Sequence, residues 1–146
     1  MSSKIFPTAQ DAENAFYEAL ERCDLDGMMA VWAEDEDILC VHPTGGRLTG
    51  QDQVRESWAK MFAAGPRARL EVTQQVAISG MMLAVHSVFE RFTLPDVKPE
   101  AQPVPIVATN IYLRTAAGWR MIVHHASPAP AQPQSAPRDS GPKILH

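Results

Sequence analysis

The segment from Asp24 to Pro43, DLDGMMAVWAEDEDILCVHP, constrains the fold more than any other part of the chain. Within twenty residues it contains a helix start, an aromatic residue, an acidic turn and a strand that ends in His-Pro. Because a residue before proline favours extended geometry, the strand predicted from Ile38 to Val41 ends at this dipeptide. The order places one ionisable group, His42, where a strand leaves the mouth of a predicted pocket.

Hydrophobic periodicity predicts three helices before the main sheet. The first runs from Thr8 to Arg22, with apolar residues at three- and four-residue spacing and Thr8 as its candidate N-terminal cap. A short second helix runs from about Asp26 to Ala33, with Asp26 as candidate cap, and a third from about Gln51 to Ala63. The four acidic residues at 34–37 stop the second helix. They could also suggest a cation site, but all come from one stretch, which favours a solvated turn.

The rest of the chain has the pattern of antiparallel strands. The segments are LEVTQQVAIS, MLAVHSVFERF, VPIVATNIYLRT and WRMIVHHAS, and together they predict a meander that the helices can cover on one face. In the first segment Leu70, Val72, Val76 and Ile78 share a parity, which predicts one common face. From Pro128 to Pro142 five prolines occur with no apolar pattern. We therefore expect a single domain at 1–127 and a disordered tail at 128–146.

Length and charge limit the classes of function. A chain of 146 residues with 45% hydrophobic and 21% charged residues fits one soluble globular domain. The net charge of −4 offers no basic face for nucleic acid or anionic lipid. No apolar run approaches the roughly 18 residues needed to span a membrane. The start, MSSKIFPTAQDAEN, lacks the apolar core of a signal peptide, so we expect a cytoplasmic protein with neither a nucleic-acid nor a membrane partner.

Several motifs, in their order, resemble those of ketosteroid isomerases. D-x-D-G at 24–27 precedes a short helix that ends in an aromatic residue and an acidic pair, and a strand ending before proline follows. L-T-G at 48–50 and V-R-E-S-W at 54–58 continue the pattern. The ending GWRMIVHHASP is similar to the final strand of SnoaL-like proteins and resembles the association domain of calcium/calmodulin-dependent kinase II. On these motifs the chain is identified as a member of the nuclear transport factor 2-like superfamily over about Ala9 to Pro130.

The resemblance implies an α+β, cone-shaped fold. Three N-terminal helices pack on a curved, mainly antiparallel sheet and enclose a mostly apolar pocket. The ligand-binding residues that it implies are aromatic: Phe16, Trp32, Trp58, Phe62 and Tyr112. Such side chains supply flat apolar walls for a ring-shaped ligand, although in any fold they would also be core residues.

The resemblance also implies three catalytic residues, His42, Asn110 and His125. In ketosteroid isomerases the residue before the equivalent proline is the aspartate that shuttles the proton; here it is His42, whose neutral ring, with a reference pKa of about 6.5, could accept and return a proton near neutrality. Asn110 matches the position of a protonated aspartic acid in the oxyanion hole, where an amide can donate a hydrogen bond. A strand-end histidine held by a hydrogen bond and a buried asparagine satisfied by backbone remain the alternatives.

Two neighbouring residues are assigned directions by the same resemblance. His124 and His125 are adjacent on a strand and face opposite sides. Registration against the family turns His125 inward, as an auxiliary donor, and His124 towards the convex face.

Phe16 stands where the family has its oxyanion-hole tyrosine. Tyr17 is one residue away, a rotation of about 100°, so it should point elsewhere.

The pattern leaves two points open and predicts no metal or cofactor. His86 and Glu90 share a face of their strand, but the sequence does not say which face. A three-histidine metal site from His42, His86 and His125 is conceivable, yet no pair has the short spacing typical of metal ligands.

The sequence thus predicts a small-molecule pocket protein of the SnoaL-like or ketosteroid isomerase-like type. As an enzyme it would be a cofactor-free isomerase or cyclase that transfers a proton on an apolar carbonyl compound. His42 would be the base, Asn110 would stabilise an enolate oxygen and His125 would donate. The alternative is a non-catalytic ligand-binding or homo-oligomerisation module resembling a kinase association domain. In either case we expect a homodimer formed through the convex sheet face.

Overall fold

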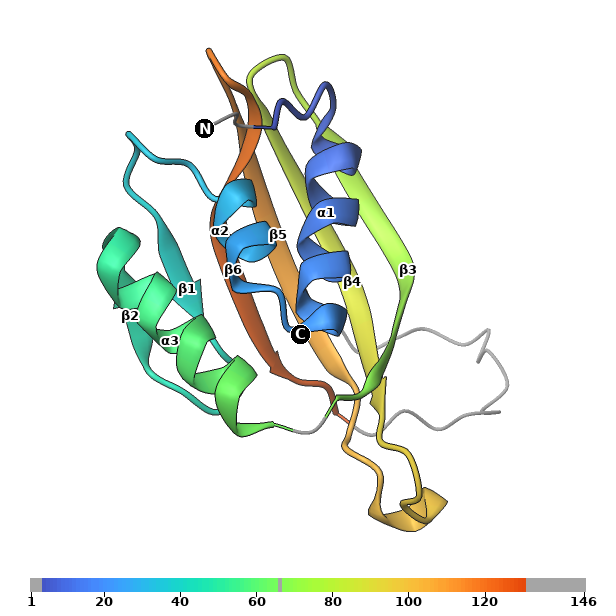
Figure 1. Ribbon diagram of the computed structural model, residues 1–146. Helices are drawn as coiled ribbons and strands as arrows, with labels where there is room; N and C mark the ends of the chain where they lie inside the picture. The colour runs from blue at the N-terminus through green and yellow to red at the C-terminus, as the bar shows by residue number, and fades with distance from the viewer. Residues whose placement is uncertain (1–3, 66, 131–146) are drawn as a thin grey trace, which may run out of the picture.

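The computed structural model describes residues 4–65 and 67–130, and in these ranges three helices pack on one face of a six-stranded mixed sheet (Figure 1). The elements in chain order are α1 (Ala9–Arg22), α2 (Leu25–Val31), β1 (Leu39–Val41), β2 (Arg47–Thr49), α3 (Gly50–Ala64), β3 (Arg69–Ser79), β4 (Leu83–Thr93), the short 3-10 helix η1 (Pro99–Ala101), β5 (Ile106–Thr115) and β6 (Gly118–Pro128). The strand order is β2-β1-β6-β5-β4-β3, with β1 parallel to β6 and the other pairs antiparallel. The predicted α+β fold is confirmed. The predicted disordered tail spans 128–146, and its residues 131–146 lie outside the described ranges.

The first two helices begin at side chains that cap them. Thr8 accepts a hydrogen bond from the backbone N–H of Asp11 at 3.0 Å, as the sequence predicted. In α2 the cap is Asp24, which accepts from the N–H of Gly27 at 3.0 Å, so the prediction of Asp26 as cap is wrong. Asp24 has the extended backbone of a cap, whereas Asp26 already lies in the first turn. The helix also ends earlier than predicted, because Trp32 is extended and bridges to β6.

The turn at 44–46 joins β1 to β2, a strand that the sequence pattern does not reveal. The backbone N–H of Gly45 donates to the carbonyl of His42 at 3.1 Å, and Arg47–Thr49 then pairs with Leu39–Val41. A strand of three residues is too short to display a period of two. This hairpin places His42 at the end of β1, where the sequence expects it.

A β-bulge changes the direction of the side chains along β3. Between Thr73 and Val76 this strand carries one residue more than β4 does between their partners, and Gln74 adopts a φ of 55° there. Before the bulge Val72 is half-buried under the helices, whereas after it Val76 and Ile78 are 60% and 64% exposed on the opposite, outer face of the sheet. The predicted common face for these residues is therefore wrong, because one extra residue shifts the period of two.

An irregularity in β6 reverses the predicted directions of two histidines. The register with β5 shifts near Ile122, so residues three apart, Met121 and His124, both point to the helix-covered face. His124 is 2% exposed, whereas His125 is exposed on the outer face. The prediction that His125 points inward and His124 outward is wrong, since strict alternation from the buried Met121 fails at the extra residue.

The aromatic residues predicted to line a pocket belong to the core between the helices and the sheet. Phe16, Trp32, Trp58 and Tyr112 are fully buried, and Phe62 packs against them. The rings of Phe16 and Trp58 are 5.7 Å apart edge to face. Within the described ranges no helix combines the length and hydropathy needed to cross a bilayer.

Candidate functional site

A cluster of polar side chains is buried beneath α1. Its members come from four elements and are each at most 7% exposed: Glu13 and Tyr17 of α1, His86 and Glu90 of β4, Asn110 and Tyr112 of β5, and His124 of β6. The spacing of four on the helix and of two or four on the strands turns each pair to one face. Buried polar groups require hydrogen-bond partners, so the pattern of bonds defines the site.

Glu13 is the acceptor at the centre of the cluster. Its Oε1 accepts from the amide of Gln75 at 2.5 Å and lies 3.1 Å from Nδ1 of His86. Its Oε2 accepts from the amide of Asn110 at 3.2 Å and from the hydroxyl of Tyr112 at 2.9 Å. Burial, with the charge of Glu13, raises the pKa of Tyr112 well above its usual value, so this phenol remains a donor. Glu13 thereby fixes the orientation of four neighbours.

The bonds of Asn110 determine the tautomer of His124. The Asn110 amide nitrogen donates to Glu13 and, at 2.9 Å, to the hydroxyl of Tyr17. Its carbonyl oxygen therefore faces Nδ1 of His124 at 2.6 Å, and this nitrogen must carry the hydrogen. Burial lowers the pKa of His124 to about 3, with smaller contributions from His42 and His125, so the ring is neutral.

The hydroxyl of Tyr17 connects this cluster to a second buried carboxyl, Glu90. The phenol donates to Oε2 of Glu90 at 2.6 Å. Burial raises the pKa of Glu90 to about 7; the bond from Tyr17 opposes this rise, and the charge of Glu13 adds to it. Burial, with the charge of Glu90, also raises the pKa of Tyr17 well above its usual value. A carboxyl that changes charge near neutrality thus faces a phenol that does not, and strongly perturbed pKa values cluster at functional sites.

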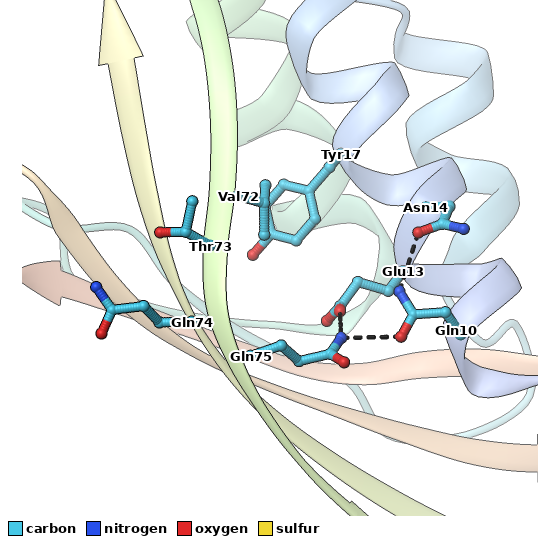
Figure 2. Close-up of a pocket in the computed structure, with 8 residues that line it drawn as sticks. All are labelled: Gln10, Glu13, Asn14, Tyr17, Val72, Thr73, Gln74 and Gln75. Carbon is cyan, nitrogen blue, oxygen red and sulfur yellow. Dashed lines mark hydrogen bonds between the residues drawn. The ribbon is translucent and has the colours of Figure 1, made fainter.

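A cleft between α1 and β3 gives access to the cluster. It has a volume of about 490 Å³, and its lining residues are Gln10, Glu13, Asn14, Tyr17, Val72, Thr73, Gln74 and Gln75. Figure 2 shows Glu13 and Tyr17 reaching from α1 towards β3. The amide of Gln75 also donates to Gln10 at 2.9 Å, and Gln10 donates to Asn14 at 3.0 Å, so a row of amides crosses the mouth. All of these lining residues except Val72 carry a polar group, unlike those of the mostly apolar pocket that the sequence predicted.

The structure does not bring the three predicted catalytic residues together. Asn110 lies within the cluster, and His125 is on the outer face. Nε2 of the half-buried His42 lies 3.1 Å from the hydroxyl of Ser57, and the His42 ring meets Trp58 edge to face at 4.6 Å. Burial lowers the pKa of His42. His42 adjoins the cluster through the ring of Trp58, which lies 6.0 Å from that of His124.

The conceivable three-histidine metal site does not form. His86 faces the helices, whereas His125 faces the opposite side of the sheet. Among the residues that the structure describes, no three His, Cys, Asp or Glu side chains are placed to hold a metal ion. The turn at 34–37 is exposed, as the sequence predicted.

Sequence reasoning missed most members of the cluster. Tyr17 was predicted to point away from the site, but the sheet is wide enough to cover two sides of α1: Phe16 packs on His124 at 4.9 Å, and Tyr17 reaches Glu90. For Glu90 and His86 a signal existed, because they share their parity with Ala84 and Val88, which are buried. For Glu13 the available signal was its position. It is a charged residue one helical turn before Tyr17 and lies beside the apolar stripe of α1.

Comparison with known proteins places this fold in a family. A model of the SnoaL-like domain matches residues 10–132. The chain belongs to the SnoaL-like family, within the nuclear transport factor 2-like superfamily. A protein from Thiobacillus denitrificans described as a calcium/calmodulin-dependent protein kinase type II association domain is 43% identical to this SnoaL-like protein, with a TM-score of 0.78 over 86% of this chain and 98% of that one.

Two further structures have the same fold. A protein from Streptomyces avermitilis described as a dehydratase of the nuclear transport factor 2-like family is 30% identical, with a TM-score of 0.69 over 82% of this chain and 92% of that one. A protein from Parabacteroides distasonis described as a ketosteroid isomerase is 19% identical, with a TM-score of 0.66 over 86% and 89% of the two chains, and shares the fold. Comparison with curated proteins gives no match.

Proposed function

We propose that this SnoaL-like protein binds a small carbonyl compound in the cleft between α1 and β3 and exchanges a proton with it through Tyr17. The observation that carries the proposal is the position of Tyr17, which lines the cleft and lies 2.6 Å from the buried carboxyl of Glu90. A group at this position can contact a ligand while a partner behind it stores a proton.

The proton transfer needs two coupled steps in one direction. Glu90 in its protonated form gives its proton to the oxygen of Tyr17, and Tyr17 gives its own hydrogen to the acceptor atom of the ligand. The net result is one proton moved from Glu90 to the ligand oxygen. Loss of the ligand's α-hydrogen as a proton to water in the cleft then gives the neutral enol, and the reverse sequence restores the ketone. A pKa of about 7 keeps both forms of Glu90 available near neutrality, as efficient general acid–base catalysis requires. The name of the 30% identical dehydratase supports acid–base chemistry in this fold.

His42 has a separate place in this proposal. Its ring is neutral near pH 7 because burial lowers its pKa, and it lies on the far side of the contact with Trp58. The base role predicted for His42 stays a prediction, and the route through Tyr17 and Glu90 does not depend on it.

The experiment uses the full chain purified under native conditions. Native mass spectrometry and a panel of cyclic ketones, followed through the amide signals of Val72 and Thr73, identify a ligand. Deuterium uptake from D2O into that ligand is then compared between the wild type and Tyr17→Phe, with His125→Phe as a control on the outer face. We expect Tyr17→Phe to slow the uptake about 100-fold, in the range measured for loss of a general acid–base group. Equal uptake in the wild type and Tyr17→Phe would contradict the proposal.

A second candidate function is homo-oligomerisation through the outer sheet face. It is favoured by the exposure of Val76 and Ile78 on that face and by the description of the 43% identical protein as an association domain. Apolar side chains of this size are usually buried when a partner is present. This function is compatible with a ligand in the cleft, because the cleft lies on the other face of the sheet.

A further inference from the structure

We propose that the protonation of Glu90 reverses the hydrogen-bonding polarity that Tyr17 presents to the cleft, so that the site prefers a carbonyl in one state and a hydroxyl in the other. The inference rests on the proposed function, since it places the ligand at Tyr17. It adds the class of ligand and the way in which the site selects between two forms of it.

The hydroxyl of Tyr17 has a limited capacity for hydrogen bonds. The oxygen of Tyr17 has one hydrogen to donate and two lone pairs to accept with. One lone pair is taken by the amide of Asn110 at 2.9 Å. That amide is fixed in orientation, because its second hydrogen is donated to Glu13 and its carbonyl oxygen accepts from His124. One hydrogen and one lone pair of Tyr17 are therefore left for Glu90 and the cleft.

The charge of Glu90 determines whether the remaining hydrogen of Tyr17 points to Glu90 or to the cleft, and the remaining lone pair takes the other direction. An ionised carboxylate can only accept, so the hydrogen of Tyr17 points to Glu90 and the lone pair is left for the cleft. A protonated carboxyl needs an acceptor for its own hydrogen. Among the described residues, the side chain hydrogen-bonded to Glu90 is Tyr17. Leaving that hydrogen without a partner in a buried site is costly. The Glu90 hydrogen then occupies the lone pair, and the hydrogen of Tyr17 turns to the cleft.

Several titratable groups surround Glu90, and three of them keep one protonation state near pH 7. The titratable groups facing it are Glu13 and Tyr17 from α1, His86 from its own strand, Tyr112 from β5 and His124 from β6, while β3 faces it with Val72. The high pKa values of the two tyrosines and the low pKa of His124 keep all three neutral near pH 7. Glu13 accepts from Gln75, Asn110 and Tyr112, and its charge opposes the ionisation of Glu90.

This reversal matches a ligand that interconverts between a keto and an enol form. The ketone oxygen only accepts and fits the state in which Tyr17 donates. The enol hydroxyl donates and fits the state in which Tyr17 accepts. When a proton passes from Glu90 through Tyr17 to the ketone oxygen and the α-hydrogen leaves as a proton to water in the cleft, the ketone becomes the enol and Glu90 becomes the carboxylate. Both partners then have the complementary form.

The test uses two probes of similar ring size, cyclohexanone as an acceptor and phenol as a donor. Their dissociation constants for the full chain are measured from the NMR amide shifts of Val72 and Thr73 at about pH 5.5 and about pH 8.5, on either side of the pKa of Glu90. We expect the preference for phenol over cyclohexanone to increase roughly fivefold at the higher pH, the factor that one net hydrogen bond supplies.

Variants assign the effect to Glu90. In Glu90→Gln the preference should no longer depend on pH, whereas Glu71→Gln, which removes an exposed carboxyl of β3, should retain the dependence. If both probes shift the amides but their preference is the same at both pH values, the reversal is wrong and the cleft remains a ligand site. If neither probe shifts them, the proposed function is wrong as well. The wild-type titration decides between these outcomes even where Glu90→Gln does not fold.

Discussion

The hydroxyl of Tyr17 lies 2.6 Å from Oε2 of Glu90, although 73 positions separate the two residues in the chain. The bond joins α1 to β4 across the helix-covered face of the sheet. It also places a carboxyl with a pKa of about 7 inside the core. The hydrogen bond between Tyr17 and Glu90 therefore affects the charge of the core, the stability of the fold and the proposed proton transfer.

Replacing Glu90 should change the pH dependence of stability. The folded-state pKa of about 7 is above the ordinary value of 4.5, so the contribution of Glu90 is fully present below about pH 4.5 and is lost as the pH rises through about 7. The loss amounts to about 3 kcal/mol. Relative to the wild type, the free energy of unfolding of Glu90→Gln should increase by about 3 kcal/mol between pH 4 and pH 8, measured by urea unfolding. The curve for the exposed Glu71→Gln should run parallel to that of the wild type. A parallel curve for Glu90→Gln would show that folding does not raise the pKa of Glu90.

Two adjacent histidines should respond very differently to the same substitution. His124→Phe removes the donor to the carbonyl of Asn110, and an unsatisfied buried acceptor costs about 1–3 kcal/mol. His125→Phe, on the outer face, should change the free energy of unfolding by less than about 0.5 kcal/mol. Chemical denaturation at about pH 7 compares the two variants. Equal effects would contradict the assigned directions of these side chains.

The low pKa of His124 gives a spectroscopic prediction. Since its folded-state pKa of about 3 is below the ordinary 6.5, its contribution to stability is present above about pH 6.5 and is lost as the pH falls towards 3. In the folded protein we expect its ¹⁵N signals to show hydrogen on Nδ1 alone and to remain unchanged from about pH 8 to about pH 5. Hydrogen on Nε2 alone would overturn the direction assigned to the Asn110 amide, and a ring that titrates near pH 6 would contradict the low pKa.

The two cysteines should differ in reactivity. Cys40 is fully buried and burial raises the pKa of its thiol to about 12, whereas Cys23 is half-exposed. The thiolate is the reactive form, so iodoacetamide should label Cys23 in the folded protein and both residues in urea. Peptide mass spectrometry locates the label. Rapid labelling of Cys40 without denaturant would mean that β1 opens readily.

The outer face should control assembly if oligomerisation occurs there. Ile78→Lys places a charge where 64% of an apolar side chain is exposed, and it should lower the average mass measured by sedimentation equilibrium. Lys60→Glu, an exposed change on α3, serves as the matched control. An assembly unaffected by Ile78→Lys would exclude this part of the face.

The fold was predictable because it depends on features that are local in the sequence. The apolar stripe of α1, the cap at Thr8 and the strand ending before Pro43 each leave a pattern within a few residues. The order of these elements was sufficient to identify the superfamily.

The site was only partly predictable because it depends on register. Asn110, which the sequence singled out, is buried in the cluster, but its partners Glu13 and His124 lie 97 and 14 positions away in the chain. The direction of His124 depends on one extra residue near Ile122, and nothing in the letters of that strand marks a bulge. Tyr17 was misjudged for a related reason, since a helix wheel does not show how far a sheet extends around it.

The bulge at Gln74 has a further consequence for how this fold can vary. Removing that single residue would let β3 pair with β4 in strict alternation and would leave Ile78 on the outer face, opposite Val85. The bulge residue can therefore be lost without exchanging the two faces of β3, so a natural deletion there would straighten the wall of the cleft and keep the outer surface unchanged.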